Sequence, residues 1–234
     1  DMRGGDGNDI YIVDNTSDSI TENSASGTDA VHSSATFTLS SDVENLTLRG
    51  SSDIDATGND SANKLKGNSG ANTLTGHGGS DTLNGGSGDD TLDAGSGNDI
   101  LDGGSGDDIL NGGDDKDTAV FSDKSNRINL ATRKKQNTSD GKDILIGIEN
   151  VNAGGGNDIV TGSKSGNVLN GEAGDDVLYG GLGNDRLTGG SGDDIFQIKK
   201  GRGKAMITDY TSGEDRIQLL GGLNASDLTF TYAD

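Results

Sequence analysis

The chain has 234 residues, of which 41 are glycine, and its formal net charge is −21. Aromatic residues make up 3% and hydrophobic residues 28% of it, too few for the core of an ordinary globular domain of this length. Without a counter-ion such a chain falls among disordered sequences. Cysteine is absent, which excludes disulfides and thiolate metal sites, and no apolar run is long enough to predict a transmembrane helix.

The first repeat-like unit lies near the start of the chain. Residues 4–12 read GGDGNDIYI, with glycine at positions two and four and Asp9 at position six. The chain begins Asp1-Met2-Arg3, without a secretory signal peptide, and it stops inside an expected strand, so we expect a piece of a longer protein. The nine-residue phase is then lost up to residue 57, and β-branched or alternating residues predict short strands at residues 10–13, 28–32, 35–39 and 45–48.

The nine-residue phase returns at residue 58 and continues to residue 120. From residue 76 it reads GHGGSDTLN, GGSGDDTLD, AGSGNDILD, GGSGDDILN and GGDDKDTAV. Position six of these units is always aspartate: Asp81, Asp90, Asp99, Asp108 and Asp117. Position eight is always apolar: Leu83, Leu92, Leu101, Leu110 and Ala119. The two preceding units carry Asn63 and Asn72 at position six, and we expect these to be structural rungs with poor or empty metal sites.

Each unit predicts a tight loop followed by a very short strand. Glycine tolerates the positive φ that a tight loop needs, and in a three-residue strand only the middle side chain points inward. Nine residues therefore make half a coil, and eighteen bring the chain back above itself. Asp81 then lies over Asp99, where the two charges would repel unless a hard cation lay between them. Loops rich in backbone carbonyls with one carboxylate each suit calcium and suit softer metals badly.

A second interruption, residues 121–152, carries a basic cluster at Arg127 and 133–135. The repeats resume at residue 153 with AGGGNDIVT, GSKSGNVLN, GEAGDDVLY, GGLGNDRLT and GGSGDDIFQ. Their sixth positions are Asp158, Asn167, Asp176, Asp185 and Asp194, and their inward residues are Val160, Leu169, Leu178, Leu187 and Phe196. Asp185 has only Asn167 one coil below it and Gly203 one coil above, so its site lacks a carboxylate partner on either side.

The two interruptions echo each other. Val43-Glu44-Asn45-Leu46 in the first corresponds to Ile148-Glu149-Asn150-Val151 in the second. We therefore expect two copies of a larger unit, each with an opening repeat, an irregular β excursion and a regular roll. In the tail, residues 206–210 and 215–219 are expected to be strands around a Thr-Ser-Gly-Glu turn.

The units resemble the nonapeptide G-G-x-G-x-D-x-U-x of RTX proteins, a calcium-binding β-helix repeat. The resemblance implies an all-β fold, a right-handed parallel β-roll (β-solenoid) in two blocks, with irregular β excursions and a C-terminal β cap. It also implies several bound Ca²⁺ ions, export by a type I secretion machine in an unfolded form, and folding in the calcium outside the cell. The tail resembles the cap that follows the β-roll of secreted serralysin-type metalloproteases.

Calcium is expected between successive loops on each side of the roll. The expected carboxylate ligands are Asp9, Asp81, Asp90, Asp99, Asp108, Asp117, Asp158, Asp176, Asp185 and Asp194. The expected glycine ligands, at positions two and four, are Gly79, Gly86, Gly88, Gly95, Gly97, Gly104, Gly106, Gly113, Gly154, Gly156, Gly174, Gly181, Gly183, Gly190 and Gly192. A purely solvated acidic surface is the alternative, and the shared phase of ten aspartate-bearing units argues against it.

The sequence divides into five parts of one continuous solenoid. These are an opening repeat with an irregular β segment (1–57), a first calcium roll (58–120), a β excursion (121–152), a second calcium roll (153–197) and a C-terminal cap (198–234). A solenoid needs such a cap, because its last coil otherwise exposes apolar residues and open strand edges.

The sequence favours a secreted or cell-surface calcium module that is not itself an enzyme. H-E-x-x-H, G-x-S-x-G and Walker signatures are absent, and no catalytic role is expected for His32 or His77. One alternative is an accessory polysaccharide-binding module of an epimerase- or protease-like enzyme, which would contact an anionic polysaccharide through Arg127, Lys134, Lys135, Arg186 and Lys199. The other is a segment of a surface adhesin. The acidic surroundings exclude nucleic acid as a partner.

Overall fold

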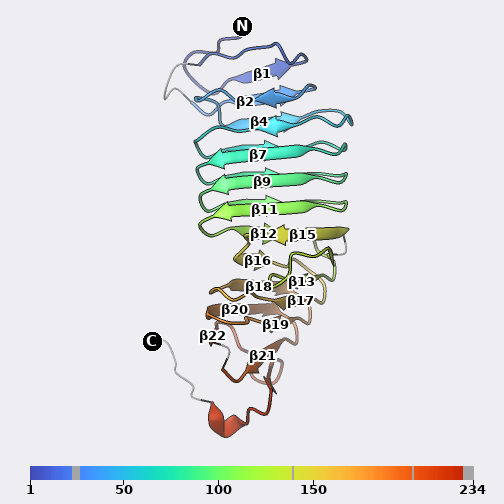
Figure 1. Cartoon of the computed structure of the whole chain (residues 1–234), viewed down its shortest axis with the longest axis vertical. Coiled ribbons are helices and arrows are strands. Elements are labelled where there is room, and N and C mark those ends of the chain that lie inside the picture. Colours follow the sequence, from blue (N-terminus) through green and yellow to red (C-terminus); the bar gives the residue numbers. More distant parts are fainter. Residues whose placement is uncertain (23–26, 139, 202, 229–234) are drawn as a thin grey trace.

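The computed structural model describes residues 1–22, 27–138, 140–201 and 203–228. Its chain winds into a tall stack of coils that runs from the N-terminal to the C-terminal end (Figure 1). One face of the stack is a continuous sheet of parallel strands, with about one strand from each coil. In order it contains β1 (Ile10–Val13), β2 (Ala30–Ser33), β4 (Asn45–Leu48), β6 (Lys64–Lys66), β8 (Thr82–Asn84), β10 (Ile100–Asp102), β12 (Thr118–Val120), β16 (Asn150–Asn152), β18 (Val168–Ala173), β20 (Asn184–Ser191) and β22 (Lys204–Ile207).

The opposite face is divided into two sheets. The upper one contains β3 (Phe37–Thr38), β5 (Ala56–Thr57), β7 (Thr73–Gly78), β9 (Thr91–Ser96), β11 (Ile109–Asp114), β15 (Lys142–Ile146) and β14 (Gln136–Asn137). The lower one contains β13 (Arg127–Asn129), β17 (Ile159–Thr161), β19 (Val177–Tyr179), β21 (Ile195–Lys199) and β23 (Arg216–Leu220). All pairs are parallel except β14 with β15. The prediction of an all-β parallel solenoid is confirmed.

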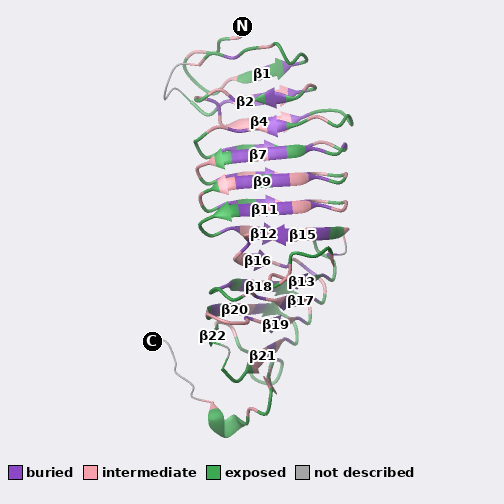
Figure 2. Ribbon diagram, viewed as in Figure 1, coloured by how far each residue is buried: buried purple, intermediate pink, exposed green. Residues whose placement is uncertain are grey.

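The register of the rolls follows the repeat. Leu83 pairs with Leu101 and Leu92 with Leu110, each one coil of eighteen residues apart. The middle residue of each short strand points between the two faces and is fully buried, whereas its neighbours face outward, as the purple bands of Figure 2 show. Burying a leucine side chain stabilises the fold by about 1.5–3 kcal/mol, so one leucine per strand makes a narrow core with little stability to spare.

The segment before residue 58, where the nine-residue phase is lost, forms coils of the same stack. Ile10 pairs with Ala30, Ala30 with Asn45, and Asn45 with Lys64. The coils are therefore 20, 15 and 19 residues long instead of eighteen. Their loops differ in length while the strands keep their register, which explains why the periodicity disappears from the sequence.

The second interruption moves the chain from one sheet to another. After β12, strand β13 starts the lower sheet of the divided face by pairing with β17, and the hairpin of β14 and β15 then returns to close the upper sheet against β11. Strand β16 rejoins the continuous face beside β12. Residues 121–152 are thus built into the stack and connect the two rolls.

The tail continues the stack before it ends. Strand β22 pairs with β20 and β23 with β21, both in parallel, so they form one further coil. A 3-10 helix, Ala225–Asp227, follows. The last residues of the expected cap, 229–234, lie outside the described residues.

Candidate metal centres

The aspartates at position six are buried at the inner side of their loops. Nine of the ten predicted carboxylate ligands expose 5% of their surface or less, and only Asp9 is half-buried. The repeat geometry explains this burial, because position six directly precedes the strand and turns its side chain back under the loop. Charged side chains are seldom buried in this way unless a partner compensates them.

Successive coils are joined through these carboxylates. In the regular rolls the backbone N–H of one aspartate donates to Oδ1 of the aspartate one coil further along. The distances are 2.7 Å for Asp81 to Asp99, 2.8 Å for Asp90 to Asp108, 2.9 Å for Asp99 to Asp117, 2.7 Å for Asp158 to Asp176 and 2.9 Å for Asp176 to Asp194. The sequence predicted these stacked pairs, and the structure places each pair together.

The second oxygen of each carboxylate has no hydrogen-bond partner. Within the described part of the chain, this applies to Oδ2 of Asp9, Asp81, Asp90, Asp99, Asp108, Asp117, Asp158, Asp176 and Asp194, all fully inaccessible to solvent. In the units that start with glycine, this oxygen lies close to that glycine: a Cβ on Gly85 would lie 2.4 Å from Oδ2 of Asp90. The loops therefore hold a series of buried anionic oxygens with one free coordination direction each.

Burial raises the pKa values of these carboxyl groups, because the charged form loses its hydration when no cation is bound. Desolvation raises the pKa of Asp108 and Asp176 to about 7, with a further upward contribution from neighbouring carboxylates. It raises the pKa of Asp81, Asp90, Asp117 and Asp158 to about 6. The pKa values of Asp99, Asp185 and Asp194 are also raised, chiefly by burial.

The glycines predicted at positions two and four all have positive φ. Gly97 shows why: at φ 133° a Cβ would lie 1.7 Å from the carbonyl oxygen of Gly79 in the coil below. Three other residues at these positions in aspartate-bearing units keep the same conformation, with φ of 79° at His77, 79° at Asp115 and 76° at Glu172, whereas the asparagine and serine residues at these positions of the asparagine-bearing units do not. The stacked loops impose this geometry even at a cost of about 1–2 kcal/mol per residue.

Asparagine at position six closes its loop without a cation. Oδ1 of Asn72 accepts from the backbone N–H of Asn68 in its own loop, and Nδ2 donates to the carbonyl of Ile54 in the previous coil at 2.6 Å. Asn167 does the same with Ser163 and the carbonyl of Glu149. The amide group thus satisfies both coils by itself, in agreement with the interpretation of these rungs as structural.

Asp185 differs from the other aspartates of the second roll. Its Oδ1 accepts from the backbone N–H of Asn167 at 3.0 Å, and its strand pairs with β22, where Ala205 stands opposite it. Among the described residues, the positions aligned with it in the adjoining coils are therefore Asn167 and Ala205, neither of which is a carboxylate; the repeat spacing predicted Asn167 and Gly203.

Five further acidic residues extend the carboxylate stacks, and the repeat pattern missed them. Each accepts from the backbone N–H of a neighbouring residue of the stack, with partners in parentheses: Asp29 (Asp9, 2.7 Å), Glu44 (Asp29, 2.8 Å), Asp143 (Asp108, 2.9 Å), Glu149 (Asp117, 3.2 Å) and Asp215 (Asp194, 3.0 Å). For the three aspartates, the sequence contains a pattern that could have identified them: each stands two residues before an apolar residue of a strand. The glutamates belong to the echoed motifs of the two interruptions.

The family comparison agrees with this geometry. The model of the RTX calcium-binding nonapeptide repeat matches the chain in four copies, over residues 57–92, 85–119, 145–165 and 161–196. The chain belongs to the RTX repeat family. Its two rolls are RTX β-rolls, and the repeats that build them are of a calcium-binding type.

No curated protein matches the chain. The RTX match ends at residue 196, so the resemblance of the tail to the serralysin cap is not confirmed. In the part of the chain that the structure describes, no helix has the length and hydrophobicity needed to cross a membrane.

Calcium fits the RTX loops on the chemistry of their donors. The available atoms are all oxygens, with one unpartnered carboxylate oxygen per aspartate rung and backbone carbonyls turned by the glycines of positions two and four. A hard cation with six to eight oxygen ligands is suited to this set. Cysteine is absent, and the two histidines lie outside position six, so softer metals have no ligands there.

Proposed function

We propose that this RTX module is a calcium-responsive folding element of a secreted protein, disordered without calcium and rigid when several Ca²⁺ ions are bound. The observation that carries the proposal is the set of nine buried carboxylate oxygens without hydrogen-bond partners. Leaving a buried polar group unpaired costs about 1–3 kcal/mol, so together they cost roughly 10–25 kcal/mol. That exceeds the net stability of about 5–15 kcal/mol of a typical domain.

The rest of the chain cannot offset this cost when its carboxylates are charged. The net charge of −21 opposes compaction, and the core contains about one inward side chain per strand. Calcium, when bound, neutralises the carboxylates and joins neighbouring coils, so its binding energy becomes folding energy. Asp81 to Asp117 of the first roll and Asp158 to Asp194 of the second are the residues that would hold it, with carbonyls at positions two and four.

The expected calcium affinity would keep the chain unfolded inside the cell and allow it to fold outside. Extracellular calcium modules bind calcium with dissociation constants of about 10⁻⁴–10⁻³ M. These values lie above the calcium concentration of the cytosol and below the calcium concentration outside the cell. A chain of this kind stays unfolded during export and folds outside the cell. RTX repeats are typical of secreted proteins, which supports this proposal.

We also propose that the module has no catalytic role of its own. Its buried carboxylates each accept a hydrogen bond from the backbone of an adjacent coil and so hold the coils together, and the sequence contains neither H-E-x-x-H nor G-x-S-x-G. An enzyme in another part of a longer protein would be compatible with this role.

Circular dichroism during a calcium titration tests the folding proposal. Starting in chelator at neutral pH, we expect a cooperative transition from coil to β-structure at about millimolar calcium or below. Magnesium should not produce it, because this ion demands octahedral geometry and gives up water reluctantly. A chain that is already β-structured in chelator at neutral pH would refute the proposal.

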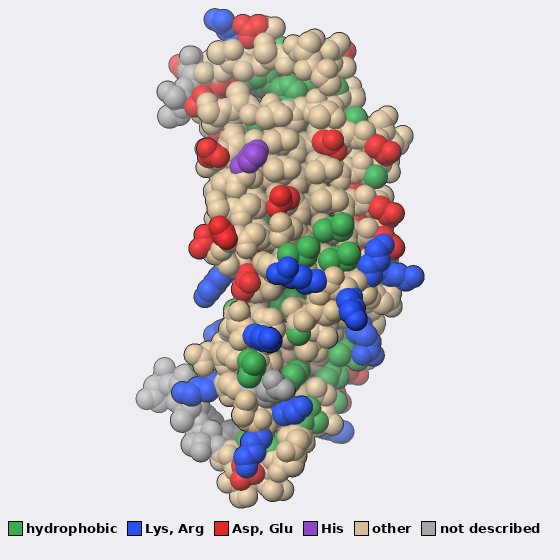
Figure 3. Space-filling model, in the orientation of Figure 1, with side chains coloured by type: hydrophobic (Ala, Val, Ile, Leu, Met, Phe, Trp, Pro, Cys, Tyr) green, Lys and Arg blue, Asp and Glu red, His purple; other side chains and the backbone are tan. Residues whose placement is uncertain are grey.

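A second candidate function is contact with an anionic polysaccharide. Residues 1–120 contain 5 basic and 23 acidic residues (−18), whereas residues 121–234 contain 13 and 16 (−3). On the face in Figure 3 most lysines and arginines lie over the middle and lower part of the stack. Calcium bound in the second roll would make that half net positive. Calcium-dependent retention of the natural chain on an alginate column, lost in a K134E/R186E variant, would support this function. If the natural chain passes through the column unretained both with and without calcium, the function is refuted.

A further inference from the structure

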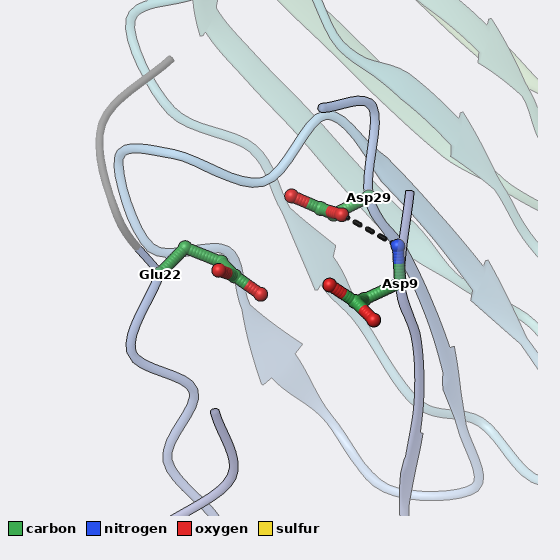
Figure 4. A group of neighbouring side chains, drawn as sticks. All are labelled: Asp9, Glu22 and Asp29. Carbon is green, nitrogen blue, oxygen red and sulfur yellow. Dashed lines mark hydrogen bonds between the residues drawn. The ribbon is translucent and has the colours of Figure 1, made fainter. Parts of the chain in front are cut away.

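The first coil brings together three acidic side chains from different segments. Asp9, Glu22 and Asp29 each offer a carboxylate oxygen, and these three oxygens lie within 4.8 Å of one another. Figure 4 shows the three carboxylates turned toward a common space, with Asp9 and Asp29 on adjacent chain segments and Glu22 facing them from the connecting loop. Like charges at this distance repel strongly unless a cation lies between them.

The position of Glu22 is fixed by the chain before the first repeat. Met2 forms a parallel bridge with Ile20, and the backbone N–H of Thr21 donates to the carbonyl of Met2 at 3.0 Å. Two residues after Ile20, Glu22 accepts from the backbone N–H of Gly5 at 3.2 Å. This coil, from Ile10 to Ala30, is two residues longer than the regular coil from Thr82 to Ile100.

Asp9 and Asp29 keep the geometry of the carboxylate stacks. The backbone N–H of Asp9 donates to Oδ1 of Asp29 at 2.7 Å, and Asp29 exposes only 2% of its surface. Oδ2 of Asp9 is buried without a hydrogen-bond partner. Among the described residues, no lysine, arginine or histidine forms a salt bridge with either aspartate. These two carboxylates therefore lack a counter-charge.

Tyr11 provides an independent sign that a ligand belongs here. It takes the inward eighth position of its unit, which is aliphatic or phenylalanine in the other units, and it is 5% exposed. Its hydroxyl is buried without a hydrogen-bond partner within the described residues. A Cβ placed on Gly4 would lie 2.4 Å from this hydroxyl and 2.2 Å from Oδ2 of Asp9, so both unsatisfied oxygens face the same space. Buried tyrosine hydroxyls usually have a partner.

We propose that Asp9, Glu22 and Asp29 bind a calcium ion in the first coil, with the Tyr11 hydroxyl in hydrogen-bonding reach of the site. The site differs from the RTX loops because Glu22 comes from outside the nonapeptide repeats and adds a third carboxylate. It rests on the proposed calcium-binding function and extends it to the N-terminal end of the stack. There it ties residues 1–22 to β1, an edge strand whose Ile10 and Ile12 are 68% and 67% exposed and which would otherwise be open to pairing with other chains.

Terbium luminescence of the full 234-residue chain tests this site. Terbium is a hard cation that takes calcium's oxygen ligands, and a nearby tyrosine sensitises its emission. The chain has 4 tyrosines and no tryptophan. Glu22→Gln is compared in the natural chain and in a Tyr11→Phe background, and bound calcium per chain is measured by equilibrium dialysis. Glu214→Gln, an exposed position, is the control with the same change of charge.

We expect Glu22→Gln to lose one bound calcium ion per chain and to lower the sensitised emission only when Tyr11 is present. Glu214→Gln should change neither quantity. An unchanged calcium count in Glu22→Gln, or an equal fall in emission with and without Tyr11, would overturn the first-coil site while leaving the rolls as calcium binders. A natural chain that binds no calcium at all would instead overturn the proposed function, so the two failures are distinguishable.

Discussion

Asp90 and Asp108 lie one coil apart and are joined by a single hydrogen bond, from the backbone N–H of Asp90 to Oδ1 of Asp108 at 2.8 Å. Oδ2 of each is buried and lacks a hydrogen-bond partner. The same arrangement recurs along both rolls. In each aspartate rung, Oδ1 accepts a hydrogen bond from the backbone of the neighbouring coil, whereas Oδ2 can be satisfied only by a cation or a proton. In the natural asparagine rungs an amide NH₂ replaces this second oxygen and donates to a backbone carbonyl of the previous coil, as Asn72 does.

Replacing Asp90 with asparagine should therefore convert a calcium rung into a closed rung. We expect Asp90→Asn to bind fewer calcium ions and to show more β-structure than the natural chain in chelator, because the amide can bond within its loop and to the coil below, as Asn72 does. Equilibrium dialysis and circular dichroism measure the two effects. The exposed Asp93→Asn, with the same charge change, should leave both near the natural values. If Asp93→Asn had the same effect, simple charge reduction would explain the result.

Gly97→Ala tests whether close contact between the loops limits the stack. Its Cβ would lie 1.7 Å from the carbonyl of Gly79, so the two coils would have to separate. Gly213 is the matched control, because it has φ 101° with no atom within 4 Å of a Cβ and its substitution incurs only the backbone cost of about 1–2 kcal/mol. We expect Gly97→Ala to shift the calcium midpoint of folding far more than Gly213→Ala. Equal shifts would show that conformation alone, and not the contact, matters.

The sequence predicts the regular rolls almost completely. Constant spacing determines both the register and the stacked aspartate pairs, so Asp81 and Asp99 could be placed together from numbering alone. The prediction weakens where loop length changes, because strands can stay paired across coils of 15, 20 or 35 residues without leaving a period in the sequence. Asp143, which accepts from the N–H of Asp108, was missed for this reason.

Two features of the structure have no sequence signal of their own. The division of one face into two sheets depends on β13 pairing with β17 instead of continuing beside β11, a choice made by tertiary contacts. The approach of Glu22 to Asp9 depends on the bridge between Met2 and Ile20, which no local pattern indicates.

The adjacent residues Ile100 and Leu101 allow a matched test of the core. Leu101 is fully buried, whereas Ile100 on the same strand is 45% exposed. We expect Leu101→Ala to lower the free energy of unfolding in excess calcium by about 2–5 kcal/mol, because it leaves a cavity in a core one residue wide. Ile100→Ala should change it by about 0.5 kcal/mol or less. Urea unfolding followed by circular dichroism measures both, and similar losses would contradict the assignment of the inner face.

Protons should substitute in part for calcium. Burial raises the pKa of Asp108 and Asp176 from 3.8 to about 7, so the folded chain holds these protons more tightly than the unfolded chain does. Their contribution to stability is fully present below the unfolded value and is lost as the pH rises through the folded value. In chelator we therefore expect β-structure to increase as the pH is lowered from about 8 to about 5, across the raised pKa values.

The same linkage predicts how calcium binding responds to pH. Protons and calcium compete for the same carboxylates of the folded chain, but between about pH 7 and pH 5 these carboxyls are protonated only in the folded chain. Protonation of Asp108 and Asp176 therefore favours folding, and the calcium midpoint of folding should fall as the pH falls below about 7. A double Asp108→Asn, Asp176→Asn variant removes the two most shifted groups and should flatten this dependence. Circular dichroism titrations at several pH values measure it. A midpoint that is independent of pH in the natural chain would mean that the buried carboxyls are already ionised in the calcium-free state.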